Sequence, residues 1–198
     1  MKKYLWIVAL FFLGTLSSCG GTASNFPIPE DKVLLEDFSD IECPYCAQFH
    51  PIVDKIRKDF PDDVVVRFVH FPLDQHKNAF HAAEAAECAR DQGEEKFWDF
   101  LREQYKRQTS LGDSTYLEIA SEMGMEKSEF EACLSSGSKA DIIRQNIREG
   151  VQRGVRGTPT AFLDKTQIDD KRFEAIVKKI QSLLKEKLST LKEGSPAL

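Results

Sequence analysis

The sequence predicts an α/β fold that carries a long helical insertion. Two short runs, 33–38 and 64–71, are rich in apolar, β-branched and aromatic residues, which is typical of strands. After the second run, residues 78–155 keep a helical apolar period throughout. With 198 residues, 41% of them hydrophobic, the chain has room for one well-packed domain and little more.

One helix is expected between these two strands. Its apolar residues recur at spacings of three and four and therefore share one face. They are Phe49, Ile52, Val53, Ile56 and Phe60. Pro51 removes one backbone hydrogen bond from this helix. Because the apolar period continues past Pro51, we expect a kink there, with a break in the helix as the alternative.

Several helices separated by single glycines fill the insertion. They are expected at 79–90, 94–108, 114–121, 127–134 and 139–155. Strand character returns only at 160–163. A last amphipathic helix is expected at about 170–188, with residues 189–198 as a loose tail.

The N-terminus is typical of a secretory signal. A basic start, Met1-Lys2-Lys3, precedes an apolar run at 4–13 that is too short to span a bilayer comfortably. Leu16-Ser17-Ser18-Cys19 then resembles a bacterial lipobox, so residues 1–18 are expected to be a lipoprotein signal peptide and Cys19 to carry lipid. An uncleaved anchor or plain secretion, with Cys19 incidental, is the alternative, and either would still export the chain.

The segment after this signal has neither helical nor strand periodicity. Residues 19–32 mix Gly, Ser and Pro, which indicates a flexible tether before a domain that begins near Val33. Residues 1–18 hold two lysines and no acidic residue, so the 27 basic residues fall to 25 against 32 acidic ones, a formal net charge of −7. Such a charge argues against nucleic acid as a partner.

Five cysteines are an odd number for an exported protein, but lipidation of Cys19 would leave four. Cys43 and Cys46 are two residues apart at a helix start, a spacing that suits a reversible active-site disulfide. Cys88 and Cys133 are then left for each other, which is one of three connectivities. Two unpaired buried thiols at Cys88 and Cys133 are the alternative.

The run Cys43-Pro44-Tyr45-Cys46 suits thiol-disulfide exchange. A cysteine at a helix N-terminus gains a stabilised thiolate from the helix dipole and free N–H groups, so Cys43 is predicted to attack. Cys46 lies one turn further in and is predicted to resolve the mixed disulfide. Pro44 fixes φ in the first turn at no cost in hydrogen bonds, and Tyr45 is expected to face outward as a substrate contact.

No metal or other cofactor is expected. A zinc site needs four ligands, and only His50 follows the cysteine pair closely. The histidines match no nucleophile pattern and are assigned structural or surface roles. They are His50, His70, His76 and His81.

Three features together resemble the DsbA-like branch of the thioredoxin superfamily. They are the strand leading into Cys43-Pro44-Tyr45-Cys46, the long helical insert, and Gly157-Thr158-Pro159-Thr160 before a strand. The resemblance covers residues 33 to about 184 and has the two motifs in the family's order. It implies the thioredoxin fold, a central mixed sheet flanked by helices, built from 33–77 and 156–188 with the helical insertion at 78–155.

The resemblance also implies roles for individual residues. The proline matching Pro159 is cis in that family and lies beside the active-site disulfide, so Thr158 and Pro159 are expected to contact substrate. An ordinary trans turn is the alternative. Asp37 matches a buried acid that could relay a proton to or from Cys46, with a surface carboxylate as the alternative.

The segments around Cys88 and Cys133 resemble inserts that hold a second, structural disulfide. This likeness favours the pairing of these two cysteines over the alternative of free thiols.

The function implied is oxidation of dithiols in exported proteins, with a membrane-embedded, quinone-linked partner that reoxidises the enzyme. A reductase stays open, because the Pro-Tyr dipeptide has no histidine and Asp40 and Glu42 bring negative charge close to Cys43. A polypeptide-binding lipoprotein with a static Cys43–Cys46 bridge is a third, non-enzymatic alternative. A monomer is expected, lipid-anchored to the cell membrane with its catalytic domain outside the cytoplasm; which membrane holds it is left open.

Overall fold

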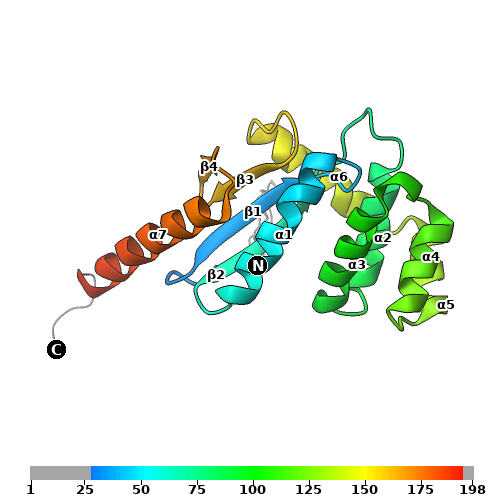
Figure 1. The fold of residues 1–198 in the computed structure, drawn as a ribbon, viewed down its shortest axis with the longest axis horizontal. Coiled ribbons are helices and arrows are strands. Elements are labelled where there is room, and N and C mark those ends of the chain that lie inside the picture. Colours follow the sequence, from blue (N-terminus) through cyan, green and yellow to red (C-terminus); the bar gives the residue numbers. More distant parts are fainter. Residues whose placement is uncertain (1–27, 194–198) are drawn as a thin grey trace, which may run out of the picture.

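Four strands form a mixed sheet with β1 in its interior (Figure 1). The computed structural model describes residues 28–193. The strand order is β2-β1-β3-β4, with β1 parallel to β2 and antiparallel to β3, and β3 antiparallel to β4. The strands are β1 (Val33–Ser39), β2 (Val64–His70), β3 (Thr160–Leu163) and β4 (Thr166–Ile168).

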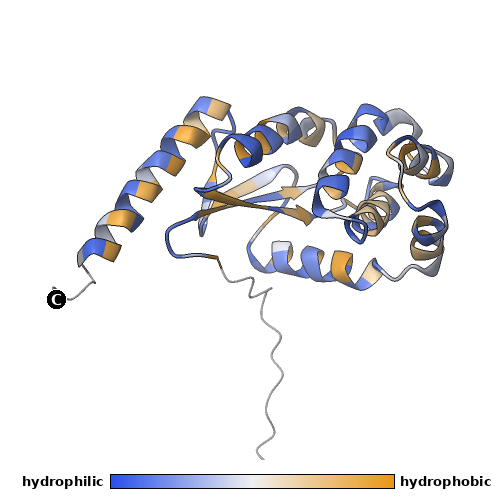
Figure 2. Cartoon of the chain, turned by 90° about the horizontal axis from the view of Figure 1, so that it is seen from below, coloured by the Kyte–Doolittle hydropathy of each residue, from blue (hydrophilic) through white to orange (hydrophobic). Residues whose placement is uncertain are grey.

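Two helices, α1 (Pro44–Asp59) and α7 (Phe173–Glu193), cover one face of the sheet. The alternation along β1 directs Val33, Leu35 and Asp37 to this side, where the side chains of Val33 and Leu35 are fully buried. In Figure 2, apolar residues recur along α7 as the bands expected of an amphipathic helix, and its C-terminal part extends past the sheet.

The opposite face of the sheet is covered by α6 (Ala140–Gln152). Here Phe38 of β1 packs against Phe71 and Phe162. Gly150 allows α6 to approach closely, since a Cβ at this position would lie 2.5 Å from the Phe71 ring. The short distance between α6 and the sheet therefore requires glycine at position 150.

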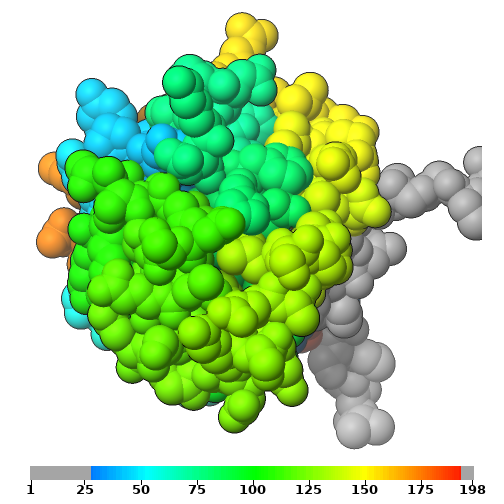
Figure 3. All heavy atoms as spheres, turned by 90° about the vertical axis from the view of Figure 1, so that its right-hand side faces the viewer, coloured from blue at the N-terminus to red at the C-terminus, as the bar shows by residue number. Residues whose placement is uncertain are grey.

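The remaining helices form the insertion. They are α2 (Ala79–Arg90), α3 (Glu94–Lys106), the short 3-10 helix η1 (Gln108–Ser110), α4 (Asp113–Glu122) and α5 (Lys127–Ser136). A disulfide between Cys88 and Cys133 joins α2 to α5. Figure 3 shows these helices, in green, covering one end of the molecule, with the light blue segment at the start of α1 reaching the surface beside them.

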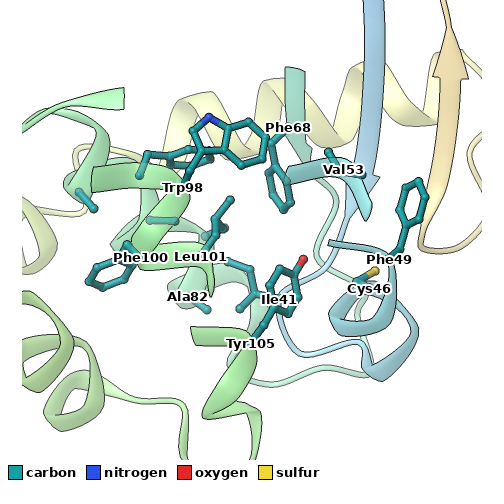
Figure 4. Close-up of a cluster of buried hydrophobic side chains, with 14 of the residues drawn as sticks. Ile41, Cys46, Phe49, Val53, Phe68, Ala82, Trp98, Phe100, Leu101 and Tyr105 are labelled. Atoms are coloured by element: carbon teal, nitrogen blue, oxygen red, sulfur yellow. The ribbon is translucent and has the colours of Figure 1, made fainter. Parts of the chain in front are cut away.

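One apolar core runs through both parts of the fold. Trp98, Phe100 and Leu101 of the insertion belong to the same buried cluster as Phe49 and Val53 of α1 (Figure 4). The junction between the sheet and the insertion is thus packed like an interior.

The structure differs from the sequence-based expectation at two places and decides one alternative. The prediction that strand character returns only at 160–163 is wrong. A further strand, β4, follows β3 after a turn in which Asp164 has a φ of 52°. α7 continues to Glu193, so a loose tail beginning at 189 is also wrong. α1 runs through Pro51 to Asp59, which excludes the break considered as an alternative.

The predictions for the signal peptide and for Cys19 lie outside the described residues. Within residues 28–193, no helix is long and apolar enough to cross a membrane.

Candidate active site

Cys43 and Cys46 lie where α1 begins, at the carboxyl end of β1. Cys43 is the N-cap residue, with φ −78° and ψ 122°, and its carbonyl accepts the first helical hydrogen bond from the Ala47 N–H at 3.2 Å. Cys43 is 4% exposed and Cys46 is 0% exposed. In the described part of the chain both are free thiols. Both cysteines are therefore buried, Cys46 completely.

The Cys46 thiol is held in its protonated form. Burial raises its pKa far above the ordinary value, and the negative charge of Asp37 raises it further. The Asp40 N–H lies 3.4 Å from Cys46 Sγ and works in the opposite direction. A group must therefore accept a proton before this sulfur can act as a nucleophile.

Asp37 has the properties of such a group. It is fully buried, and burial raises the pKa of its carboxyl from 3.8 to about 7. The Ser39 hydroxyl donates to Asp37 Oδ1 at 2.5 Å, while Oδ2 has no hydrogen-bond partner among the described residues. Asp37 can therefore take up or release a proton close to neutral pH.

The peptide bond between Thr158 and Pro159 is cis and lies against the active-site thiol. The Cys43 thiol donates to the Thr158 carbonyl oxygen at 3.5 Å. The two loops meet because β3 pairs with β1 in a register that places Thr160 beside Phe38. Sheet pairing thus brings two motifs together that are far apart in the sequence.

Two further side chains predicted to contact substrate lie beside Cys43. Pro44 and Tyr45 are both exposed, and the Tyr45 side chain is 68% exposed. The outward orientation predicted for Tyr45 agrees with this exposure.

The two acids expected to oppose the Cys43 thiolate are held by hydrogen bonds. Asp40 is buried and accepts from the Glu42 N–H and the Leu73 N–H, both at 2.7 Å, and it pairs with His76 Nδ1 at 2.8 Å. Glu42 binds the Asn78 N–H at 2.8 Å. Both carboxylates thereby fasten the loop before α2 to the active-site loop.

The insertion contributes two side chains that the sequence did not single out. The Gln108 amide nitrogen donates to the carbonyls of Ile41 and Cys43. Tyr105 is buried in the same cluster as Ile41 and Cys46 (Figure 4), and its hydroxyl finds no hydrogen-bond partner in residues 28–193. Burial and then the charges of Cys46 and Asp37 raise the pKa of Tyr105. No local pattern could reveal either residue, because their contacts arise only when the insertion packs against the core.

His50 is part of the packing. Its ring is stacked on Trp98 at 6.0 Å with an interplanar angle of 16°, and burial lowers its pKa to about 4. Among the described residues no group of three or more His, Cys, Asp and Glu side chains could hold a metal ion.

The chain matches a family model described as Thioredoxin over residues 29–182. Solved structures share its fold. Oxidised BdbD from Bacillus subtilis is 24% identical, with a TM-score of 0.67 that covers 77% of this chain and 88% of BdbD. α-DsbA1 from Wolbachia pipientis is 20% identical, with a TM-score of 0.69 over 81% of this chain and 89% of α-DsbA1. MdbA, a thiol-disulfide oxidoreductase from Corynebacterium diphtheriae, is 18% identical, with a TM-score of 0.67 over 78% and 86%.

Curated proteins with similar sequence are far longer. Over 137 residues the chain is 34% identical to the Na(+)/H(+) antiporter NhaA of Herminiimonas arsenicoxydans, covering 69% of this chain and 21% of the antiporter. The NhaA 1 antiporter of Mycolicibacterium gilvum is 28% identical over 139 residues, 22% of its length. The chain thus spans about a fifth of these relatives. The similarity identifies a shared segment, and the fold predicted from the resemblance is confirmed.

Proposed function

We propose that this chain, which belongs to the thioredoxin family, is a thiol-disulfide oxidoreductase of the cell envelope. Its redox pair is Cys43 and Cys46. One observation carries the proposal. Cys43 is the N-cap residue of α1, its sulfur lies 3.5 Å from the Thr158 carbonyl oxygen, and the buried Cys46 follows one turn later. This arrangement offers one sulfur to a partner and keeps the other for resolution.

The reaction starts from the Cys43–Cys46 disulfide. A substrate thiolate attacks Cys43 Sγ, a mixed disulfide forms, and Cys46 leaves as a thiolate. The high pKa of Cys46 makes that thiolate take a proton at once, and Asp37 supplies it. The second substrate thiolate then attacks the substrate sulfur of the mixed disulfide and releases Cys43 as a thiolate. The substrate loses two electrons and gains a disulfide, while both enzyme cysteines end reduced.

Asp37 also serves the return of the enzyme to its oxidised form. Cys46 must lose its proton before it can displace a partner bound to Cys43. The free Oδ2 of Asp37 can accept that proton, because the pKa of this carboxyl is about 7. The same carboxyl therefore acts as acid in one direction and as base in the other.

Substrate is proposed to bind as an extended segment beside Thr158 and Pro159. Pro159 has no N–H, and the backbone of Thr158 can pair with a strand that approaches Cys43. Pro44 and Tyr45, exposed on the other side of Cys43, complete this contact surface.

Oxidation is favoured over reduction as the direction in vivo. A stabilised Cys43 thiolate stabilises the reduced enzyme and makes the disulfide a stronger oxidant. Asp40 and Glu42 oppose that thiolate with their negative charge, and hydrogen bonds from the neighbouring loop hold both carboxylates in place. Exported proteins with cysteine thiols are the proposed substrates, and a membrane-embedded, quinone-linked protein is the proposed reoxidant.

The test is oxidation of a reduced dithiol peptide by stoichiometric oxidised protein, with Cys43→Ala as the control. We expect the wild type to transfer its disulfide and the variant to transfer none. A wild-type protein that leaves the peptide reduced would instead support the static bridge of a polypeptide-binding lipoprotein.

Direction is measured separately, by equilibrating the Cys43–Cys46 couple with glutathione buffers. A couple more oxidising than glutathione supports the oxidase. A couple near that of cytosolic thioredoxins would assign the protein as a reductase.

Attachment to the membrane is proposed to occur through lipid on Cys19. Full-length protein should fractionate with membranes, and mass analysis of the extracted protein should find a chain that begins at a lipid-modified Cys19. An unmodified Cys19 would rule out this anchor.

A further inference from the structure

One side chain of the insertion binds the backbone on both sides of the active-site turn. Gln108 Nε2 donates to the Ile41 carbonyl oxygen at 2.6 Å and to the Cys43 carbonyl oxygen at 2.9 Å. A carboxamide nitrogen carries two N–H groups, so one amide can serve both acceptors. Gln108 therefore bridges the residue before Glu42 and the residue after it.

These two carbonyls belong to the turn that presents the thiol. The Cys43 N–H donates to the Asp40 carbonyl at 3.1 Å, which closes the turn, and the Cys43 carbonyl also accepts the first hydrogen bond of α1. Cys43 has no side-chain cap of its own. Gln108 thus adds two external hydrogen bonds at the point where the chain enters the helix.

Gln108 is itself fixed by the insertion. It opens η1, in which the Ser110 N–H donates to the Arg107 carbonyl at 2.9 Å. The Thr115 hydroxyl at the start of α4 donates to the Ser110 carbonyl. The side chain that reaches the active-site turn is therefore anchored to two helices of the insertion.

We propose that Gln108 is a positioning residue for the thiol exchange, which clamps the Ile41 and Cys43 carbonyls so that the Cys43 sulfur stays at the N-terminus of α1. The inference rests on the proposed function for its role in exchange. The insertion, and not the thioredoxin-like core alone, then fixes the geometry that stabilises the Cys43 thiolate. When the clamp is lost, the turn gains conformational freedom and the thiolate loses its alignment with the first-turn N–H groups.

Gln92 provides a matched control. Its side chain also makes two hydrogen bonds to backbone, donating to the Glu126 carbonyl at 3.0 Å and accepting from the Glu126 N–H at 2.8 Å. Both of its contacts lie inside the insertion. Gln92→Ala therefore removes two hydrogen bonds between a side chain and the backbone, as Gln108→Ala does, without touching the active-site turn.

Two readouts are used on full-length wild type and variants. The first is the rate at which iodoacetamide alkylates Cys43 in the reduced protein at fixed pH, and the second is the equilibrium of the Cys43–Cys46 couple with glutathione. A hydrogen bond contributes on the order of 1 kcal/mol, which corresponds to a change of about five- to tenfold. Gln108→Ala should therefore slow alkylation of Cys43 by this factor and shift the glutathione equilibrium toward the enzyme disulfide by the same factor. Gln92→Ala should change either value by less than about twofold.

A second variant separates clamping from packing. Gln108→Met has nearly the same length but no N–H group to donate to the two carbonyls, so its effect should match that of Gln108→Ala. This variant also serves if Gln108→Ala fails to fold.

The proposal is overturned if both Gln108 variants stay within about twofold of the wild type, or if Gln92→Ala shifts the readouts equally. The alkylation rate does not depend on disulfide transfer. A wild type that oxidises no peptide thus counts against the proposed function alone.

Discussion

Asp37 is a carboxyl group buried with one hydroxyl as its hydrogen-bond partner in the described structure. Burial raises its pKa from 3.8 to about 7, so the folded protein binds this proton more tightly than the unfolded chain does. The contribution of Asp37 to the free energy of unfolding is fully present below the unfolded pKa. It is lost as the pH rises through the folded pKa of about 7. An ionised Asp37 thus works against folding, whereas the proposed relay needs this ionised form to accept the Cys46 proton.

Asp37→Asn should therefore raise the free energy of unfolding at pH 8, by roughly 2–4 kcal/mol. The gain should shrink as the pH falls and disappear at about pH 2.5, below the unfolded pKa of 3.8, where the wild-type carboxyl is protonated in both states. Guanidinium unfolding at the two pH values measures the difference. The same variant should slow peptide oxidation, because Cys46 loses its proton partner.

Asp40→Asn supplies a comparison, because Asp40 accepts three hydrogen bonds where Asp37 accepts one. Asp40→Asn should destabilise the fold at pH 8. If Asp37→Asn destabilised it as well, the electrostatic account of Asp37 would be wrong.

The position of Cys43 and Cys46 at a helix start and the cis bond before Pro159 could be predicted, because each lies in a short sequence motif. Gln108 and Tyr105 are unremarkable in the sequence, since what they do depends on the docking of the insertion against the active-site turn.

Among the elements, α6 depends on a glycine for its distance from the sheet. A Cβ at Gly150 would meet the Phe71 ring at 2.5 Å and Phe38 at 3.2 Å, so the helix or the rings must move. Gly150→Ala should lower the free energy of unfolding by about 1–3 kcal/mol, despite the higher helix propensity of alanine.

Chemical denaturation measures this free energy, with Val151→Ala as the control. Val151 is the next residue and is 62% exposed, so its replacement should hardly change the free energy of unfolding. Phe71→Leu combined with Gly150→Ala should recover part of the loss. Additive losses in the double variant would show that the ring is not the obstacle.

Helices α2 and α4 are joined by an ion-pair bridge through His81. Its ring nitrogens lie 3.1 Å from Glu84 and 2.7 Å from Asp113. Burial disfavours the charged ring, but the hydrogen bonds to both carboxylates outweigh it and raise the pKa of His81. The bridge therefore stabilises the fold fully below the unfolded pKa, and this contribution is lost as the pH rises through the folded pKa.

His81→Gln should consequently cost more stability at pH 6 than at pH 9. Because the ring is partly exposed, the difference should be modest, about 0.5 kcal/mol. Thermal unfolding at the two pH values measures it. A cost that is equal at both would mean that the bridge does not depend on the charge of His81.

The expected elements were those with a clear apolar period. β4 was missed because Thr166 and Gln167 are exposed polar residues of an edge strand, and their pairing follows from the turn at Asp164. The end of α7 was placed too early, although Leu188 and Leu191 continue the apolar spacing from Leu184. Both side chains are exposed, so the last turns of the helix do not depend on burial of an apolar face.

At the scale of the whole molecule, the insertion and the sheet share one core. His50 of α1 and Phe68 of β2 both contact Trp98 of α3, so the aromatic cluster spans the boundary between the two parts. Each part would expose this cluster if it unfolded alone, which makes independent unfolding unfavourable.

We therefore expect a single cooperative transition. Trp98 is buried at the junction and reports on it by fluorescence, while far-UV circular dichroism reports mainly on the helices. The two signals should give coincident denaturation curves for the oxidised protein.

Removing the Cys88–Cys133 disulfide tests how far the shared core sustains this behaviour. Cys88→Ala with Cys133→Ala frees a loop of 45 residues and should lower the free energy of unfolding by about 3–4 kcal/mol. Because the core at the junction is untouched, fluorescence and dichroism should still coincide at the lower midpoint. Peptide oxidation should stay within about twofold of the wild type, since the altered sulfurs lie outside the active-site turn. Separate transitions in this variant would mean that the disulfide, and not the aromatic junction, couples the insertion to the sheet.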